Sequence, residues 1–143
     1  MNIFFDTSSL FKLYHEEEGT AKLLDFLNTN PDNKIFISQL TLVEMYSALL
    51  KKVRIGHLSL SEMKAFLVVL DNDLRKFSLV QIDSAVIAKA QELIIKYGLN
   101  GLRSLDAIQL ASAISIKSLV DVAFTGDILL KRFFTEEGIN CDF

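Results

Sequence analysis

Apolar residues follow two alternating patterns along this chain. Short runs rich in β-branched or aromatic residues lie at 2–5, 34–38, 78–82 and 120–124, with a possible edge strand at 139–143. Such runs are typical of buried strands. Between them, apolar residues recur at helical spacing, in stretches marked by Leu10, Leu13 and Tyr14, by Leu23 and Leu27, by Leu42, Met45 and Leu49, by Met63, Phe66 and Leu70, by Val86, Ala90 and Leu93, by Ile108, Ala111 and Ile116, and by Leu129 and Phe133. Strands separated by helices predict a three-layer α/β/α sandwich with a mainly parallel sheet.

The composition favours one domain over residues 1–143. The chain has six glycines and one proline, Pro31, in the Asn30-Pro31 step that is expected to end the second helix. Half of the residues are hydrophobic, which excludes a disordered chain. No apolar run approaches the roughly 20 residues that span a bilayer, and no basic stretch precedes an apolar one at the N-terminus. With one cysteine, Cys141, these features predict a cytoplasmic protein without a membrane partner.

Four acidic residues occupy positions where an α/β sheet binds ligands. Asp6 directly follows the first expected strand, and Asp127 follows the fourth in Phe-Thr-Gly-Asp. Glu44 lies in the helix after the second strand, and Asp106 lies at the start of the helix before the fourth strand. Ligands of such sheets bind beyond the carboxyl ends of the strands. We therefore expect the four carboxylates to converge on one rim of the sheet.

Each acid also has a purely structural interpretation. Asp6 and Asp127 are suited to cap the helices that follow them. Thr41-x-x-Glu44 has the spacing of a capping box, and Asp106 near a helix start would complement the helix dipole.

The combination of the four favours a metal site. Glu44 and Asp106 stand among apolar residues, where an unpaired carboxylate is costly. A cluster of carboxylates needs a counter-cation, and oxygen ligands without His or Cys favour Mg²⁺ or Mn²⁺. Such ions suit phosphodiester hydrolysis because they activate water and stabilise the leaving oxygen.

The ordered motifs resemble the PIN domain, and in particular the VapC-type ribonuclease toxins of toxin–antitoxin pairs. The resemblance is carried by Asp6-Thr7-Ser8, Glu44 in Leu-Thr-Leu-Val-Glu-Met, Asp106 in Arg-Ser-Leu-Asp-Ala-Ile, and Phe-Thr-Gly-Asp127. It implies a metal-dependent endoribonuclease that forms a homodimer and is held inactive by an antitoxin protein. By motif match, Asp6, Glu44, Asp106 and Asp127 are the metal ligands and catalytic residues. Thr7, Ser8 and Thr125 match polar positions that support ligands or position water.

The net charge of −3 argues at first against an RNA partner bound by bulk charge. Removing four acidic charges from −3 would leave +1 on the rest of the chain. Candidates for contact with substrate phosphate are Arg103, Lys12, Lys51 and Lys52. The default interpretation of the lysines is a solvated helix end, and Arg103 is at least as well suited to pack its side chain near a helix start. Asp121, inside the fourth expected strand, has no role that the sequence assigns.

Other phosphate-handling classes fit less well. A receiver module normally has paired acids after its first strand, and a haloacid-dehalogenase-type phosphatase needs Asp-x-Asp, but Asp6 stands alone before Thr7 and Ser8. Glycine-rich phosphate loops are missing. Two alternatives stay open: a catalytically silent PIN-like module that binds a protein, and an RNA-processing nuclease that is not a toxin. Metal dependence separates the silent module from an enzyme.

Overall fold

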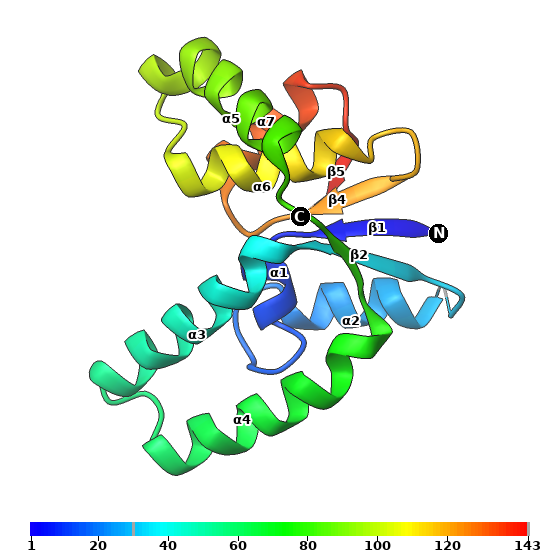
Figure 1. The fold of residues 1–143 in the computed structure, drawn as a ribbon. Coiled ribbons are helices and arrows are strands. Elements are labelled where there is room, and N and C mark those ends of the chain that lie inside the picture. The colour runs from blue at the N-terminus through cyan, green and yellow to red at the C-terminus, as the bar shows by residue number, and fades with distance from the viewer. Residues whose placement is uncertain (30, 143) are drawn as a thin grey trace.

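A parallel sheet runs through the middle of the molecule (Figure 1). The computed structural model describes residues 1–29 and 31–142. Within them the sheet has five strands in the order β3-β2-β1-β4-β5, all parallel. The strands are β1 (Asn2–Phe5), β2 (Lys34–Ser38), β3 (Ser78–Val80), β4 (Val122–Phe124) and β5 (Cys141–Asp142).

Helices cover both faces of the sheet, which confirms the predicted three-layer sandwich. One face carries α1 (Thr7–Phe11), α2 (Thr20–Thr29), α3 (Gln39–Arg54) and α4 (Leu60–Asp73). The other carries α5 (Ser84–Tyr97), α6 (Ser104–Ser115) and α7 (Ile128–Glu136), drawn on the upper side in Figure 1. Short 3₁₀ turns, η1 (Leu74–Lys76) and η2 (Gly98–Asn100), follow α4 and α5. None of the helices described combines the length and apolar character that a membrane crossing requires.

The alternation of side chains along β1 explains why the sheet is covered twice. Ile3 and Phe5 belong to the core beneath α1–α4, whereas Phe4 belongs to the core beneath α5–α7. Successive residues of a strand point to opposite faces, so a fully apolar strand needs a helical layer on each side. Phe5 packs edge-on against Phe124 of β4, with ring centroids 5.7 Å apart.

Several elements are shorter than their sequence pattern predicts. The first helix ends at Phe11, so the expected helical positions Leu13 and Tyr14 lie beyond it, although both pack against the core. The strand expected at 78–82 ends at Val80, because the chain then leads to Asp83, the N-cap of α5. The strand expected at 120–124 begins at Val122, where pairing with β1 starts. Asn30 and Phe143, expected at a helix stop and in the edge strand, lie outside the described residues.

The strand order determines where the connections that follow neighbouring strands run in opposite directions. The chain builds outward from β1 to β3, then returns to place β4 and β5 on the other side of β1. The switch point, where such sheets bind ligands, therefore lies between β1 and β4. The backbone N–H of Asp6 donates to the carbonyl of Phe124 at 3.2 Å, so the residue after β1 is tied to the end of β4.

Gly101 turns the chain from η2 into α6 and offers a test of this connection. Its φ of +99° is left-handed, and a Cβ there would lie 3.1 Å from Leu129 Cδ2. We expect Gly101→Ala to lower the free energy of unfolding by about 1–2 kcal/mol, measured by urea denaturation. Gly98→Ala is the matched control, because Gly98 has φ −58° and its added Cβ would meet nothing closer than 3.7 Å. Equal losses in both variants would contradict the backbone explanation.

Candidate active site

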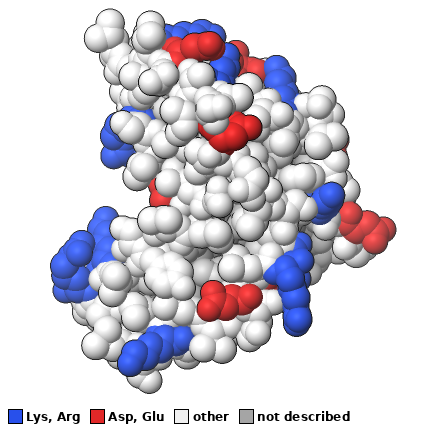
Figure 2. All heavy atoms as spheres, in the orientation of Figure 1, with Lys and Arg blue, Asp and Glu red and all other residues white. Residues whose placement is uncertain are grey.

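The four predicted acids line one cleft at the carboxyl end of the sheet. Its volume is about 730 Å³, and its lining includes Asp6, Glu44, Asp106 and Asp127. Figure 2 shows this side of the molecule hollowed between the part formed by α5–α7 and the part that contains α3 and α4, with acidic atoms at the floor of the hollow. The structure therefore brings together side chains that are as many as 121 positions apart in the sequence.

Asp6 is the most deeply placed of the four, at 5 % exposure. Its carboxylate accepts hydrogen bonds from Ser9 N at 2.8 Å, Ser8 Oγ at 2.8 Å and Thr125 Oγ1 at 2.6 Å. Burial raises the pKa of Asp6 above its usual value, and the bonds from Thr125, Ser9 and Ser8 oppose that rise. The capping interpretation of Asp6 is thus confirmed, and the same carboxylate still lines the cleft.

Glu44 does not belong to a capping box. The helix α3 begins at Gln39 with Ser38 as its N-cap, so Thr41 lies inside the helix and is fully buried. The Glu44 Oε2 atom instead accepts hydrogen bonds from Thr7 Oγ1 and, at 2.7 Å, from Gln109 Nε2. The capping-box interpretation is wrong because the helix starts earlier than the Thr41-x-x-Glu44 spacing requires.

Asp106 lies in the first turn of α6, and Asp127 is the N-cap of α7. Asp106 accepts a hydrogen bond from Arg103 Nε at 3.2 Å. Asp127 caps α7 by accepting from Leu129 N at 2.8 Å and Leu130 N at 3.0 Å. Asp127 therefore caps a helix and lines the cleft with the same side chain.

The predicted polar residues connect these acids. Thr125 donates to Asp6 Oδ2 and accepts from the backbone N–H of Asp127 at 3.0 Å, so one hydroxyl joins two of the four acids. Ser8 Oγ contacts Asp6 and accepts from Gly126 N at 2.7 Å. Thr7 contacts Glu44 instead.

The basic candidates are placed very differently from one another. Lys51 and Lys52 line the cleft from the last turns of α3, where Lys52 pairs with Glu17 at 2.6 Å. The side chain of Arg103 is 78 % exposed and is paired with Asp106. Lys12 is buried and lies outside the cleft lining, close to Ser8 and Gly126. The two lysines of α3 are therefore the best placed to meet a ligand in the cleft.

Asp121 lies at the opposite end of the sheet. Its Oδ2 accepts a hydrogen bond from Asn2 N at 2.7 Å, and its backbone N–H donates to Asn2 O at 2.9 Å. Asp121 thus begins the pairing of β1 with β4, a structural role that the sequence did not reveal.

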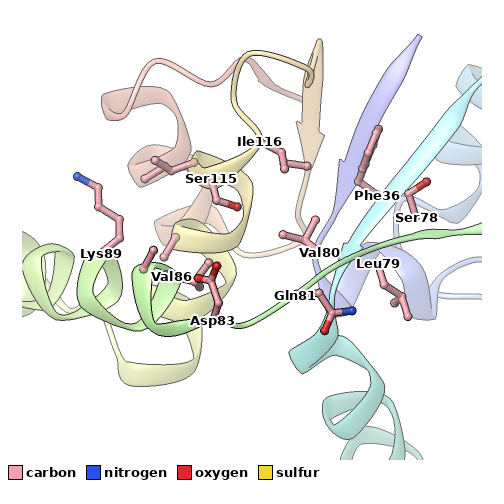
Figure 3. Close-up of a pocket in the computed structure, with 13 residues that line it drawn as sticks. Phe36, Ser78, Leu79, Val80, Gln81, Asp83, Val86, Lys89, Ser115 and Ile116 are labelled. Carbon is pink, nitrogen blue, oxygen red and sulfur yellow. Dashed lines mark hydrogen bonds between the residues drawn. The ribbon is translucent and has the colours of Figure 1, made fainter.

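A second hollow lies beside β3, at one edge of the sheet (Figure 3). Its volume is about 630 Å³, and its charged lining residues are Asp83 and Lys89. Asp83 Oδ1 accepts from Val86 N at 2.9 Å as the cap of α5, and Lys89 pairs with Glu92 at 3.2 Å. These groups already have structural partners, so the chemistry of the molecule is concentrated in the other cleft.

Gln109 is the site residue that sequence reasoning missed. It is 2 % exposed and lines the cleft, and its amide bonds to Glu44. The sequence does contain a signal for this role. Gln109 is a polar residue between Ile108 and Leu110, in a helix whose other residues predict that it is largely buried. Buried polar side chains usually have a specific partner.

The cleft fits an open divalent-cation site better than a closed one. Across the described residues, no three His, Cys, Asp or Glu side chains are already gathered around a point that would hold an ion. The donors on the cleft are carboxylate, hydroxyl and amide oxygens, with Gln109 Oε1 buried and without a hydrogen-bond partner among those residues. Mg²⁺ is commonly held by one or two carboxylates together with waters and substrate phosphates. Asp6, Glu44, Asp106 and Asp127 are suited to that kind of binding.

Comparison with known proteins identifies the family. The model of the PIN domain matches residues 3–133. The chain belongs to the PIN domain family. No curated protein sequence matches this PIN domain.

Solved structures share its fold. FitAcB from Neisseria gonorrhoeae matches with a TM-score of 0.73 and 16% identity, over 99% of this chain and 96% of that one. VapBC2 from Rickettsia felis, bound to a DNA fragment from their promoter, has a TM-score of 0.68 and 16% identity, over 99% and 98% of the two chains. VapC20 from Mycobacterium tuberculosis, a sarcin-ricin loop cleaving toxin, has a TM-score of 0.65 and 19% identity, over 96% and 95%.

Proposed function

We propose that this PIN domain is a Mg²⁺- or Mn²⁺-dependent endoribonuclease toxin that hydrolyses RNA phosphodiester bonds. The observation that carries the proposal is the single cleft lined by Asp6, Glu44, Asp106 and Asp127 at the switch point of the sheet. The fold shared with VapC20, a sarcin-ricin loop cleaving toxin, supports the same kind of activity.

The residues of the cleft have separate tasks in this mechanism. A divalent cation, when bound, supplies Lewis-acid stabilisation of phosphate charge and lowers the pKa of water. Asp6 is oriented for cation binding by Ser8, Ser9 and Thr125, and Thr7 orients Glu44. Lys51 and Lys52 offer positive charge at the rim, where the phosphate backbone of RNA would lie.

The proposal includes two protein partners, an antitoxin and a second copy of this chain. The acidic residues that line the cleft outnumber the basic ones, so a basic antitoxin segment would complement its charge and hold the enzyme inactive. A toxin-antitoxin complex from Klebsiella pneumoniae shares this fold and supports an antitoxin partner. Exposed apolar residues on α5 and in the turn after it, including Ile95 and Leu99, support a homodimer. A cytoplasmic location remains part of the proposal.

The direct test is cleavage of structured RNAs by the purified chain. We expect cleavage with Mg²⁺ or Mn²⁺ and its loss in excess EDTA, because the carboxylates cannot approach phosphate without a counter-cation. Gel analysis of end-labelled RNA measures this, and readdition of Mn²⁺ should restore the products.

Two other outcomes would replace the proposal. Equal cleavage in excess EDTA would contradict the metal mechanism. Absence of cleavage under all metal conditions, with the fold intact, would favour a catalytically silent protein-binding module. A small neighbouring reading frame with a DNA-binding N-terminal segment distinguishes a toxin from an RNA-processing nuclease.

A further inference from the structure

Gln109 sits at the centre of a buried hydrogen-bond network beneath the cleft. Its Nε2 lies 2.7 Å from Glu44 Oε2, 3.0 Å from Thr7 Oγ1 and 3.0 Å from Thr41 Oγ1. These contacts join α6 to α1 and α3, three helices that are far apart in the sequence. Gln109 is therefore placed to control how Glu44 enters the cleft.

The charge of Glu44 determines which end of the Gln109 amide faces it. With Nε2 toward Glu44, an N–H donates to a carboxylate, which is a strong, charge-assisted hydrogen bond. The reversed amide would set Oε1 against a carboxylate oxygen, and neither atom carries a proton to share. The donor end of Gln109 is thus held toward Glu44.

Both hydrogen bonds to Glu44 fall on the same oxygen. Thr7 and Gln109 donate to Oε2, whereas Oε1 accepts no hydrogen bond from any described residue. One oxygen of Glu44 is anchored to the protein, and the other is left to the cleft that Glu44 lines.

The amide oxygen of Gln109 is placed differently from the amide nitrogen. Gln109 Oε1 is buried and lacks a hydrogen-bond partner among the residues described. Leaving a buried acceptor unsatisfied is unfavourable. An apolar side chain of similar size would leave no unsatisfied oxygen here, but it would release Glu44 and remove a donor from Thr41.

We propose that Gln109 is a positioning residue, which anchors Oε2 of Glu44 so that Oε1 is presented to a divalent cation. The proposal rests on the proposed function, because it assumes that the cleft binds Mg²⁺ or Mn²⁺. Residues that orient a metal ligand typically change metal affinity or activity by about 10–100-fold when they are lost.

The test measures Mn²⁺ binding by calorimetry, in the absence of RNA, so that it does not depend on cleavage. Gln109→Met keeps the approximate size of the side chain and removes the donor. We expect its Kd for Mn²⁺ to rise by about 10–100-fold in a protein that still folds, as circular dichroism checks. Gln109→Leu is the second variant, should Gln109→Met fail to fold. Ser112→Ala is the control, because Ser112 lies on the same buried helix but contacts Ser38.

A double-mutant cycle distinguishes positioning from an independent effect. In a Glu44→Gln background, Gln109→Met should change Mn²⁺ affinity by less than about 2-fold, because the carboxylate it acts through is gone. Full additivity of the two changes, or unaltered Mn²⁺ affinity in Gln109→Met, would overturn the role of Gln109 as a positioning residue and leave the proposed function in place. A wild-type protein that binds no Mn²⁺ would overturn the proposed function and the assignment together.

Discussion

Asp6→Asn is expected to reduce metal-dependent RNA cleavage by about 100-fold or more. Loss of a residue that only orients a metal ligand costs about 10–100-fold, so loss of a charged ligand should cost at least as much. The substitution keeps the shape of the side chain and one oxygen that can still cap α1 through Ser9 N. Single-turnover rates with Mn²⁺, together with circular dichroism of the variant, measure the two effects separately.

Asp121→Asn provides the matched control for Asp6→Asn. It removes the same charge from the same sheet, but at the end where β1 begins and far from the cleft lining. Cleavage by Asp121→Asn should therefore match that of the wild type. If both variants lost activity to the same degree, net charge rather than a ligand position would explain the loss.

Although Asp6→Asn should lose activity, its metal-free form should be at least as stable as the wild type. Burial raises the pKa of Asp6 in the folded, metal-free protein, so the folded state holds this proton more tightly than the unfolded state. The stabilising contribution of the proton is complete below the unfolded pKa of about 3.9 and is lost as the pH rises through the folded pKa. At pH values above the folded pKa, the wild type bears a buried charge that Asp6→Asn lacks. Urea denaturation without metal should show the variant equal or more stable, with a difference that shrinks in acid.

The positions of β1 and β2 could be predicted well because most of their residues are apolar and are covered on both faces of the sheet. Asn2–Phe5 and Lys34–Ser38 are both found as predicted, since continuous apolar runs of that length pack only inside such a sandwich. The same logic located Asp6 and Asp127, because residues in the loops that follow parallel strands lie at the carboxyl rim.

What sequence could not supply was the partner of each polar group. Thr41 and Glu44 have the spacing of a capping box, but Thr41 contacts Gln109, which is 68 positions away. Local spacing reports only on contacts within one or two helical turns. The network around Gln109 forms when α6 packs beside α1 and α3, and that packing depends on the strand order of the whole sheet.

Thr125→Val is expected to lower Mn²⁺ affinity and cleavage although it leaves all four carboxylates of the cleft unchanged. Thr125 is 1 % exposed, and its hydroxyl donates to Asp6 and accepts from Asp127 N. Valine has the same shape but leaves the Asp127 N–H without this acceptor and Asp6 Oδ2 without this donor. We expect the free energy of unfolding to fall by about 1–3 kcal/mol. Mn²⁺ affinity and cleavage should each fall by about 10–100-fold, measured by calorimetry and RNA cleavage.

Two variants separate the hydroxyl of Thr125 from other effects of its substitution. Thr125→Ser keeps the hydroxyl and should retain most of the Mn²⁺ affinity. Thr135→Val makes the same chemical change on the exposed side of α7, where Thr135 donates only to Lys131 O at 3.1 Å, and should leave Mn²⁺ affinity unaltered. Normal Mn²⁺ binding by a folded Thr125→Val protein would show that Asp6 and Asp127 do not depend on their shared hydroxyl. Since Thr125 directly follows β4, such a result would also show that cation binding does not depend on the side chain at the end of this strand, next to the loop that places Asp127 on the cleft.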